Sequence, residues 1–296
     1  MDQARQQETE PEVVTDRSKQ REQEDHEFVP VVVKRSDEAR RHPDDTLQQS
    51  VKEGLEQTQR GSISLAISSL AGGMILGFTA MAVGVATEAA ASIAVPLAGR
   101  LLAAAVYPLG FVICILSGAQ LFTEHTALAV YPVLDKKASP WQLLRVWIIV
   151  IAGNLAGALL IAALLSAADP IIDAREGYIH VGRHLVNQPL LPLLVSSLLA
   201  GWLMAQGAWL VMAMPATTGQ MLAIYIVTFL IGVGNLHHSI AGAVEMFLAL
   251  MASNDFTIGQ AAAFIGVALF GNLVGGSVFV AILNYAYIRR TQAVSE

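Results

Sequence analysis

Two adjacent histidines, His237 and His238, stand in the middle of a long apolar stretch of the chain. This stretch, residues 184–244, contains no Asp, Glu, Lys or Arg. Gly234 precedes the pair and Gly242 follows it, which favours an interrupted helix. Polar groups inside a membrane must find partners, so ionisable residues there are typical of a functional site. The alternative is a histidine that only ties two neighbouring helices together.

A second polar patch lies earlier in the chain and matches the histidine pair. Residues 120–126 (QLFTEHT) compare with residues 235–241 (NLHHSIA) at an offset of 115 residues. The segment GNLAG at 153–157 compares with GNLVG at 271–275 at an offset of 118 residues. The order of polar patch followed by Gly-Asn-Leu-x-Gly therefore occurs twice at nearly constant spacing, which indicates an internal repeat.

Each repeat would hold three spans, so the two copies must enter the membrane with opposite topology. An inverted repeat of this kind predicts a site near the midplane, where two broken helices meet. The glycines would let neighbouring helices approach closely; they are Gly153 and Gly157 in the first copy and Gly271 and Gly275 in the second. Asn154 and Asn272 are expected to bond backbone groups freed by the breaks, or simply to link helices. The half-helices would direct their partly positive amino ends towards an anion.

Charged residues are distributed very unevenly. Residues 1–60 carry 25 of the 42 Asp, Glu, Lys and Arg residues and a net charge of −5. The remainder contains uncharged runs at 61–87, 101–123, 146–168, 184–244 and 256–288. A spanning helix needs about 20 apolar residues, so the fold class predicted is an all-α polytopic membrane protein. The sequence has no basic stripe of the kind that binds nucleic acid, and Cys114 is the only cysteine.

The chain divides into four predicted segments. Residues 1–43 are expected to form a disordered cytoplasmic tail, and 291–296 a short cytoplasmic tail. Residues 44–60 have Leu47, Val51 and Leu55 at helical spacing. They predict an amphipathic helix against the cytoplasmic face, with a solvated linker as the alternative. Residues 61–290 form the six-helix channel domain, with spans at 62–86, 97–131, 142–166, 190–213, 219–250 and 258–287.

The second and fifth predicted spans are long for one crossing, and each contains a polar patch, so both are expected to be broken. Basic residues then give the orientation. Lys136, Lys137 and Arg145 follow the second span, and Arg289 and Arg290 follow the sixth. The positive-inside rule predicts that both termini are cytoplasmic, in a multi-pass protein of the cell inner membrane.

Four segments in this order resemble the formate/nitrite transporter family, over residues 62–290. They are GAQLFT at 118–123, GNL at 153–155, HSIA at 238–241 and GNLVGG at 271–276. The resemblance implies an aquaporin-like fold and a homopentamer with one pore in each protomer. It also implies conduction of small monovalent anions of weak acids, such as formate or nitrite. Neither enzymatic activity nor a cofactor is expected.

The resemblance also assigns the candidate pore residues. His238 matches the central pore histidine of the family, and Thr123 matches the loop threonine that faces it. The remaining matches are to apolar constrictions or to the loop itself: Tyr107, Phe111, Leu121, Phe122 and Ile231. Helix packing is the alternative role for the aromatic members of this group.

The chain departs from the family pattern at several points. Glu124 and His125 make the first patch more ionisable than usual, and His237 takes a position often held by Glu. A lysine is usual ahead of the fourth span; here the nearest residues are Arg183 and His184. The sequence therefore predicts a divergent member of the family.

These residues suggest a proton-linked mechanism. A bare anion crossing apolar rings has a large desolvation cost, while its neutral acid has a far smaller one. Histidine titrates near pH 6.5, so a proton at or near His238 would neutralise the anion before it crosses. The expected partners are an anion, a proton and the lipid bilayer.

Two other functions stay open from the sequence. One is an aquaporin-like channel for a small neutral solute, in which the histidines only donate hydrogen bonds. The other is an intramembrane metalloenzyme, whose ligands would be His125, His237, His238, Glu124 and Glu245.

Overall fold

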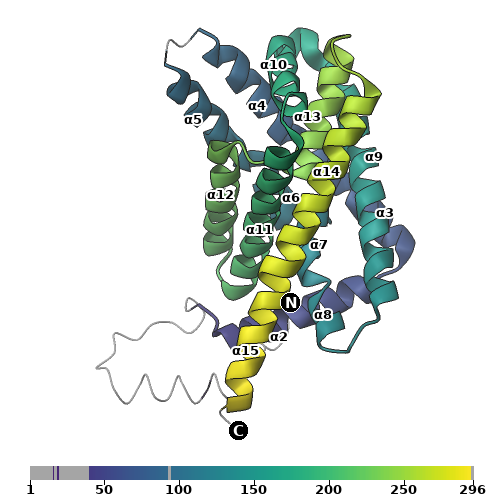
Figure 1. The fold of residues 1–296 in the computed structure, drawn as a ribbon, viewed down its shortest axis with the longest axis vertical. Helices are drawn as coiled ribbons and strands as arrows, with labels where there is room; N and C mark the ends of the chain where they lie inside the picture. Colours follow the sequence, from purple (N-terminus) through teal and green to yellow (C-terminus); the bar gives the residue numbers. More distant parts are fainter. Residues whose placement is uncertain (1–15, 17–18, 20–39, 93–94, 295–296) are drawn as a thin grey trace, which may run out of the picture.

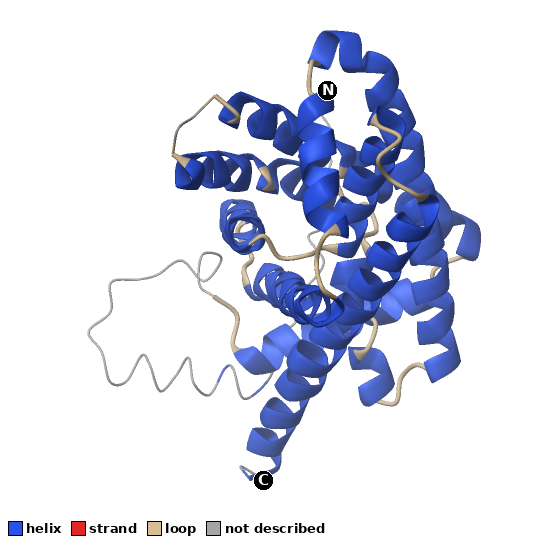
Figure 2. Ribbon diagram, turned by 45° about the horizontal axis from the view of Figure 1, so that its top comes forward, coloured by secondary structure: helices blue, strands red, loops and turns tan. Residues whose placement is uncertain are grey.

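The computed structural model describes residues 16, 19, 40–92 and 95–294, and all regular structure in these residues is helical (Figure 2). The predicted disordered segment 1–43 lies almost entirely outside this part of the chain. Six helical segments are long and apolar enough to cross a membrane, which confirms the predicted six-helix fold class. They are Ser62–Ala90, Pro96–Leu116, Pro140–Ile172, Leu190–Ala213, Thr217–Gly234 and Ile258–Gln292.

The first half of the chain contains eight of the described helices (Figure 1). In order they are α2 (Pro43–Gln59), α3 (Ser62–Ile75), α4 (Gly77–Ala90), α5 (Pro96–Val106), α6 (Pro108–Leu116), α7 (Phe122–Leu128), α8 (Tyr131–Leu134) and α9 (Pro140–Ile172). The second half contains α10 (Arg175–Val186), α11 (Leu190–Ala213), α12 (Thr217–Gly234), α13 (Ser239–Ala252), α14 (Ile258–Gly276), the π-helical turn η1 (Ser277–Ile282) and α15 (Leu283–Val294).

The second and fifth spans are both interrupted, as predicted. We call residues 117–121 the first break and residues 235–238 the second break. At the first, Gly118 has a φ of 71°, and the Ala119 N–H bonds the Cys114 carbonyl. At the second, Asn235 has a φ of 49°, and the next N–H bonds the Ile231 carbonyl. Both helices therefore end in the same left-handed cap, a conformation that Gly and Asn tolerate best.

An asparagine from a neighbouring helix satisfies each break. Asn154 on α9 accepts a hydrogen bond from the Phe122 N–H at 2.9 Å and donates to the carbonyls of Ser69 and Gln120 at 2.7 and 2.8 Å. Asn272 on α14 accepts from the Ser239 N–H at 2.8 Å and donates to the carbonyls of Ser197 and His237 at 2.6 and 3.0 Å. The backbone opened by each break thus finds the partners that an apolar environment requires.

These bonds define the register of the inverted repeat. Phe122 and Ser239 are equivalent positions, so the offset at the breaks is 117 residues. The sequence comparison has an offset of 115, which aligns Thr123 with His238. In the structure, the residue equivalent to His238 is Leu121, because each immediately precedes its half-helix. The sequence comparison pairs two residues that touch, not two that are equivalent.

Close helix packing supports the same repeat. A Cβ added to Gly157 on α9 would lie 2.1 Å from the Leu70 carbonyl oxygen on α3. A Cβ on Gly275 of α14 would lie 2.1 Å from the Leu198 carbonyl oxygen on α11. Each pair of helices therefore meets backbone to backbone, which only glycine permits at these two positions.

The helix α2 lies at the same end of the bundle as α15 (Figure 1) and packs against α7, α8, α9, α11 and α15. Leu47 and Val51 are buried by this packing. Gly54 passes so close to α7 that an added Cβ would lie 2.0 Å from the Leu128 carbonyl oxygen. Arg145 on α9 fixes the end of α2 through the Thr58 carbonyl at 2.8 Å.

The opposite end of the bundle carries α10, which packs against α4 and α13 (Figure 1). The predicted spans leave this segment as a connection between the third and the fourth. The segment folds as a helix because its small and apolar residues share one face: Gly177, Tyr178, Ile179, Gly182 and Leu185 are all buried. This helix forms one wall of the site described next.

Candidate pore and vestibule

The two breaks meet through one side-chain contact. Thr123, in the first turn of α7, lies 2.8 Å from the His238 ring, measured from Oγ1 to Nε2. Both side chains are buried, with exposed fractions of 0% for Thr123 and 1% for His238. The contact thus joins two half-helix amino ends, as an inverted repeat with a midplane site requires.

His238 is also the amino-terminal cap of α13. Its Nδ1 accepts a hydrogen bond from the Ala241 N–H at 3.2 Å. A ring nitrogen that accepts carries no proton, so the neutral ring holds its proton on Nε2 and donates it to Thr123. The Thr123 hydroxyl then accepts from the ring and keeps its own hydrogen for a further acceptor.

Aromatic rings lie next to this pair. Phe111 on α6 contacts the His238 ring edge to face, with centroids 4.9 Å apart at 86°. Tyr107 packs against Phe111 at 5.2 Å. Leu121 and Phe122 are fully buried at the start of α7. Apolar side chains therefore surround the one polar contact between the breaks.

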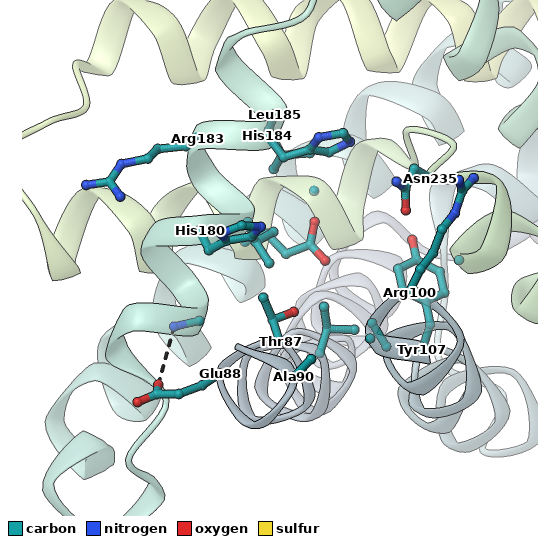
Figure 3. A pocket seen from close by; sticks show the side chains of 18 of the residues that line it. Thr87, Glu88, Ala90, Arg100, Tyr107, His180, Arg183, His184, Leu185 and Asn235 are labelled. Carbon is teal, nitrogen blue, oxygen red and sulfur yellow. Dashed lines mark hydrogen bonds between the residues drawn. The ribbon is translucent and has the colours of Figure 1, made fainter. Parts of the chain in front are cut away.

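A cavity of about 680 Å³ leads to this contact. We call it the vestibule; its walls come from α4, α5, α10, α12, the second break and the first turns of α13 (Figure 3). Four of the predicted pore residues line it, namely Tyr107, Ile231, His237 and His238. The other five do not: Phe111, Leu121, Phe122, Thr123 and Glu124.

Basic and acidic side chains share the vestibule. Figure 3 shows Arg100 on α5 at one side of the vestibule, and His180 and His184 on α10 at the other. Arg100 donates to the Val233 carbonyl at 2.6 Å, and Arg183 bonds Asp255 at 2.7 Å. Burial lowers the pKa of His184 below its usual value, and the charges of the nearby His180 and Arg100 lower it further. These surroundings keep His184 mainly neutral at neutral pH, so the arginines carry the fixed positive charge.

A family model described as formate/nitrite transporter matches residues 44–286. The chain belongs to the formate/nitrite transporter family. One relative is the inner membrane protein YfdC of Escherichia coli (strain K12), 28% identical over 246 residues, which cover 80% of this chain and 76% of the relative. The family and the solved neighbours described next are transporters and channels, not enzymes.

Two solved structures share the fold. An "FNT family ion channel" matches with a TM-score of 0.75 at 20% identity, over 83% of this chain and 99% of that one. A "pentameric formate channel with formate bound" matches with a TM-score of 0.64 at 19% identity, over 77% of this chain and 97% of that one.

In this formate/nitrite transporter family member, the two histidines of the pair face different partners. The His237 Nδ1 bonds the Ser196 hydroxyl, while its Nε2 has no partner among the described residues. Its ring stacks on His184 with centroids 6.1 Å apart and meets Phe264 edge to face. His237 therefore belongs to the vestibule wall, whereas His238 belongs to the contact between the breaks.

Glu124 and His125 lie away from the vestibule, on α7. His125 bonds the Gln120 side chain through Nε2, and its carbonyl accepts from the Trp147 indole at 3.1 Å. The residues proposed as metal ligands are thus divided: Glu124 and His125 lie on α7, while the other three line the vestibule. Within the described part of the chain, no group of three or more His, Cys, Asp or Glu could hold a metal ion.

Sequence reasoning missed the position of Glu245 in the vestibule. The sequence suggests it only as a possible metal ligand, but its side chain lines the vestibule on α13. The available signal is its spacing, because a residue seven positions after His238 lies on the same helical face.

Proposed function

We propose that this protein conducts small monovalent anions of weak acids, such as formate or nitrite, together with a proton. The observation that carries the proposal is the Thr123–His238 contact, which joins the two breaks at the inner end of the vestibule. A polar pair of this kind inside an uncharged, apolar surrounding is typical of a substrate site in a membrane protein.

The vestibule favours entry of an anion. Arg100 supplies positive charge along its wall, and the amino end of α13 supplies a partial positive charge at His238. A carboxylate or nitrite oxygen at the inner end can accept a hydrogen bond from the Thr123 hydroxyl. The anion is thereby held at the midplane without a full protein charge beside it.

The apolar residues then require a proton. Phe111, Leu121 and Phe122 leave no charged group to replace the water that an anion loses. A bare anion moving past them would face a penalty of several kcal/mol, on the order of that for any unpaired buried charge, whereas its neutral acid would not. Transport therefore proceeds with one proton for each anion.

His238 acts in this scheme by binding and orienting the substrate. Protonating its Nδ1 would break the bond from the Ala241 N–H. It would also place a cation at the positive end of α13, where the helix dipole opposes it. The neutral ring can hold Thr123 in place and receive the acid, which makes His238 the central pore histidine without making it the proton source.

Assembly and orientation follow the same family. We propose a homopentamer, the state of the solved pentameric formate channel that shares the fold. Large apolar side chains exposed along α5, α6 and α12 would be covered by lipid or by neighbouring protomers; they include Leu97, Leu101, Leu109, Ile113, Leu222, Ile226 and Leu230. The end that carries α2 and α15 faces the cytoplasm, in the inner membrane.

A flux experiment in proteoliposomes tests the proposal. Formate, nitrite, acetate and a neutral solute such as glycerol are compared across pH, with a pH dye inside the vesicles. We expect formate or nitrite flux with a matching proton movement, and at least about tenfold less with His238→Ala. His180→Ala, an exposed histidine of the vestibule wall, serves as the control. Glycerol flux without anion flux would instead favour the neutral-solute channel.

A further inference from the structure

The vestibule contains one buried carboxyl group that the proposed mechanism has not used. Glu245, on α13, has an exposed fraction of 9%, and its side chain lines the vestibule. It forms no hydrogen bond or ion pair with any residue that the structure describes. A polar side chain buried to this degree without a partner indicates a ligand or a proton-transfer role, because its isolation has a free-energy cost.

Glu245 lies directly on the route to the Thr123–His238 contact. His238, Gly242 and Glu245 are spaced by four and three residues, so they share one face of α13, and all three line the vestibule. Glu245 is about 10 Å further along the helix axis than His238. The space beside Gly242 holds the ring of Phe264 on α14, which an added Cβ would approach to 2.7 Å and which also lines the vestibule. Because Glu245 lies further from the midplane than His238, an anion moving inwards along this face reaches the carboxyl group first.

Among the described residues, no charged neighbour forms an ion pair with Glu245. The other titratable groups that share the vestibule are Glu88, Arg100, Tyr107, Glu176, His180, Arg183, His184, His237 and His238. Of the two arginines, Arg100 bonds the Val233 carbonyl and Arg183 bonds Asp255. Of the other helices packed on α13, α3 and α14 contain no titratable side chain, and α9 carries Arg145 and Asp169 near its two ends. The remaining groups on α10 are Arg175, which bonds the Ala252 carbonyl, and Tyr178.

The protonated form of Glu245 suits this position. An ionised, unpartnered carboxylate would be a buried charge and would repel the anion that the vestibule collects. A carboxylic acid instead donates a hydrogen bond to an incoming anion. His238 cannot take this role without losing its bond to Ala241, so the proton must come from another group.

Building on the proposed function, we propose that Glu245 transfers a proton to the substrate anion in the vestibule, before the substrate reaches the Thr123–His238 contact. The O–H bond of the glutamic acid breaks, and an O–H bond forms on a substrate oxygen. The electron pair of the broken bond stays on the glutamate, which becomes a carboxylate. The neutral acid moves inwards, and a proton from water at the vestibule mouth restores Glu245.

The test compares Glu245→Gln with the wild-type protein in full-length form, using formate in proteoliposomes with an internal pH dye. Between about pH 5 and about pH 8, wild-type flux should fall only weakly with pH, since Glu245 supplies the proton. Flux through Glu245→Gln should follow the formic acid already present in bulk, and so fall about tenfold per pH unit. Glu245→Asp should restore the weak dependence in part.

Glu176→Gln is the matched control, because Glu176 is an exposed carboxyl of the same vestibule. It should keep the wild-type pH profile. An identical profile in Glu245→Gln and wild type would overturn this inference and leave the proposed function intact. Absence of any formate-linked flux in wild-type vesicles, compared with protein-free ones, would overturn both.

Infrared difference spectra of the wild-type protein give a second measurement. Adding formate to the wild-type protein should shift the carbonyl stretch of a protonated carboxyl group, because Glu245 donates a hydrogen bond to the bound anion before the proton moves. Glu245→Gln should lack that change. A wild-type spectrum in which this band does not respond to formate would contradict the transfer.

Discussion

The two breaks share a backbone and differ in their side chains. Both helices end in a left-handed residue, both breaks bond an asparagine, and both half-helices start at equivalent positions. At the offset of 117 residues, however, the side chains are unlike. The equivalent pairs are Leu121 with His238, Thr123 with Ile240, His125 with Gly242, and Leu128 with Glu245.

This difference separates what the fold needs from what the pore needs. Unpaired backbone groups in an apolar environment impose the same requirement on both halves, and Asn154 and Asn272 meet it in the same way. Binding and protonating a substrate impose no such symmetry. The second half supplies His237, His238 and Glu245, while the first half supplies Thr123, Arg100 and the apolar residues beside the contact.

The largest expected effect concerns the asparagine bonds that the two breaks share. Asn154→Leu and Asn272→Leu each leave two buried backbone groups of a break without partners, an N–H and a carbonyl, at roughly 1 to 3 kcal/mol for each group. We expect both variants to lose most of their stability, and by similar amounts. Thermal unfolding of the detergent-purified protein measures this. A large loss in one variant beside a small loss in the other would break the equivalence of the two halves.

A smaller effect on stability, with a large effect on transport, is expected at His238. His238→Asn can still cap α13, since Asn is a preferred cap residue, but it is too short to reach Thr123. The unfolding temperature should change little, while formate flux should fall at least about tenfold. His238→Leu, which copies the first break, should in addition lose about 1 kcal/mol of stability. If His238→Asn transported normally, the asymmetry between the breaks would not be functional.

The smallest effect is expected at Asp135 and Asp255, the aspartates that follow the half-helices α7 and α13 in the chain. Burial raises the pKa of Asp135, but hydrogen bonds to Lys137 and Arg289 outweigh it and hold this pKa below its usual value. A lowered folded-state pKa stabilises above the unfolded value, and that stability is lost as the pH falls through the folded value. Asp135→Asn should therefore cost less than about 1 kcal/mol near pH 7, and less still in acid.

The counterpart in the second half is the control for this measurement. Asp255 bonds Arg183 at the other end of the bundle and is exposed, so Asp255→Asn should give no measurable change in the unfolding temperature. Unfolding curves recorded across acid pH compare the two variants. Equal losses would mean that burial of the ion pair does not decide its strength here.

The sequence predicted the spans and the breaks because those features depend on composition. Uncharged runs indicated the helices, and a polar patch within a long span indicated each interruption. It did not predict the register of the repeat. Apolar sequences align nearly as well two residues apart, and only the hydrogen bonds of Asn154 and Asn272 distinguish the two alignments.

Two parts of the site also required three-dimensional information. The sequence did not predict the helix α10, because its buried face combines glycines with apolar side chains whose partners on α4 and α13 are distant in sequence. Glu245 is visible in the sequence, but nothing there shows that it stays unpartnered beside the vestibule. Its isolation depends on which neighbouring arginines are already bonded elsewhere.

The asparagine bonds have a consequence for biosynthesis. Asn154 lies 32 residues after Phe122, and Asn272 lies 33 residues after Ser239, each on the next spanning helix to be made. During insertion, each half-helix therefore reaches the translocon before the side chain that satisfies its backbone has been delivered to the membrane. Each three-helix half should stay at the translocon until its asparagine arrives, which makes the half, and not the single helix, the unit of membrane integration.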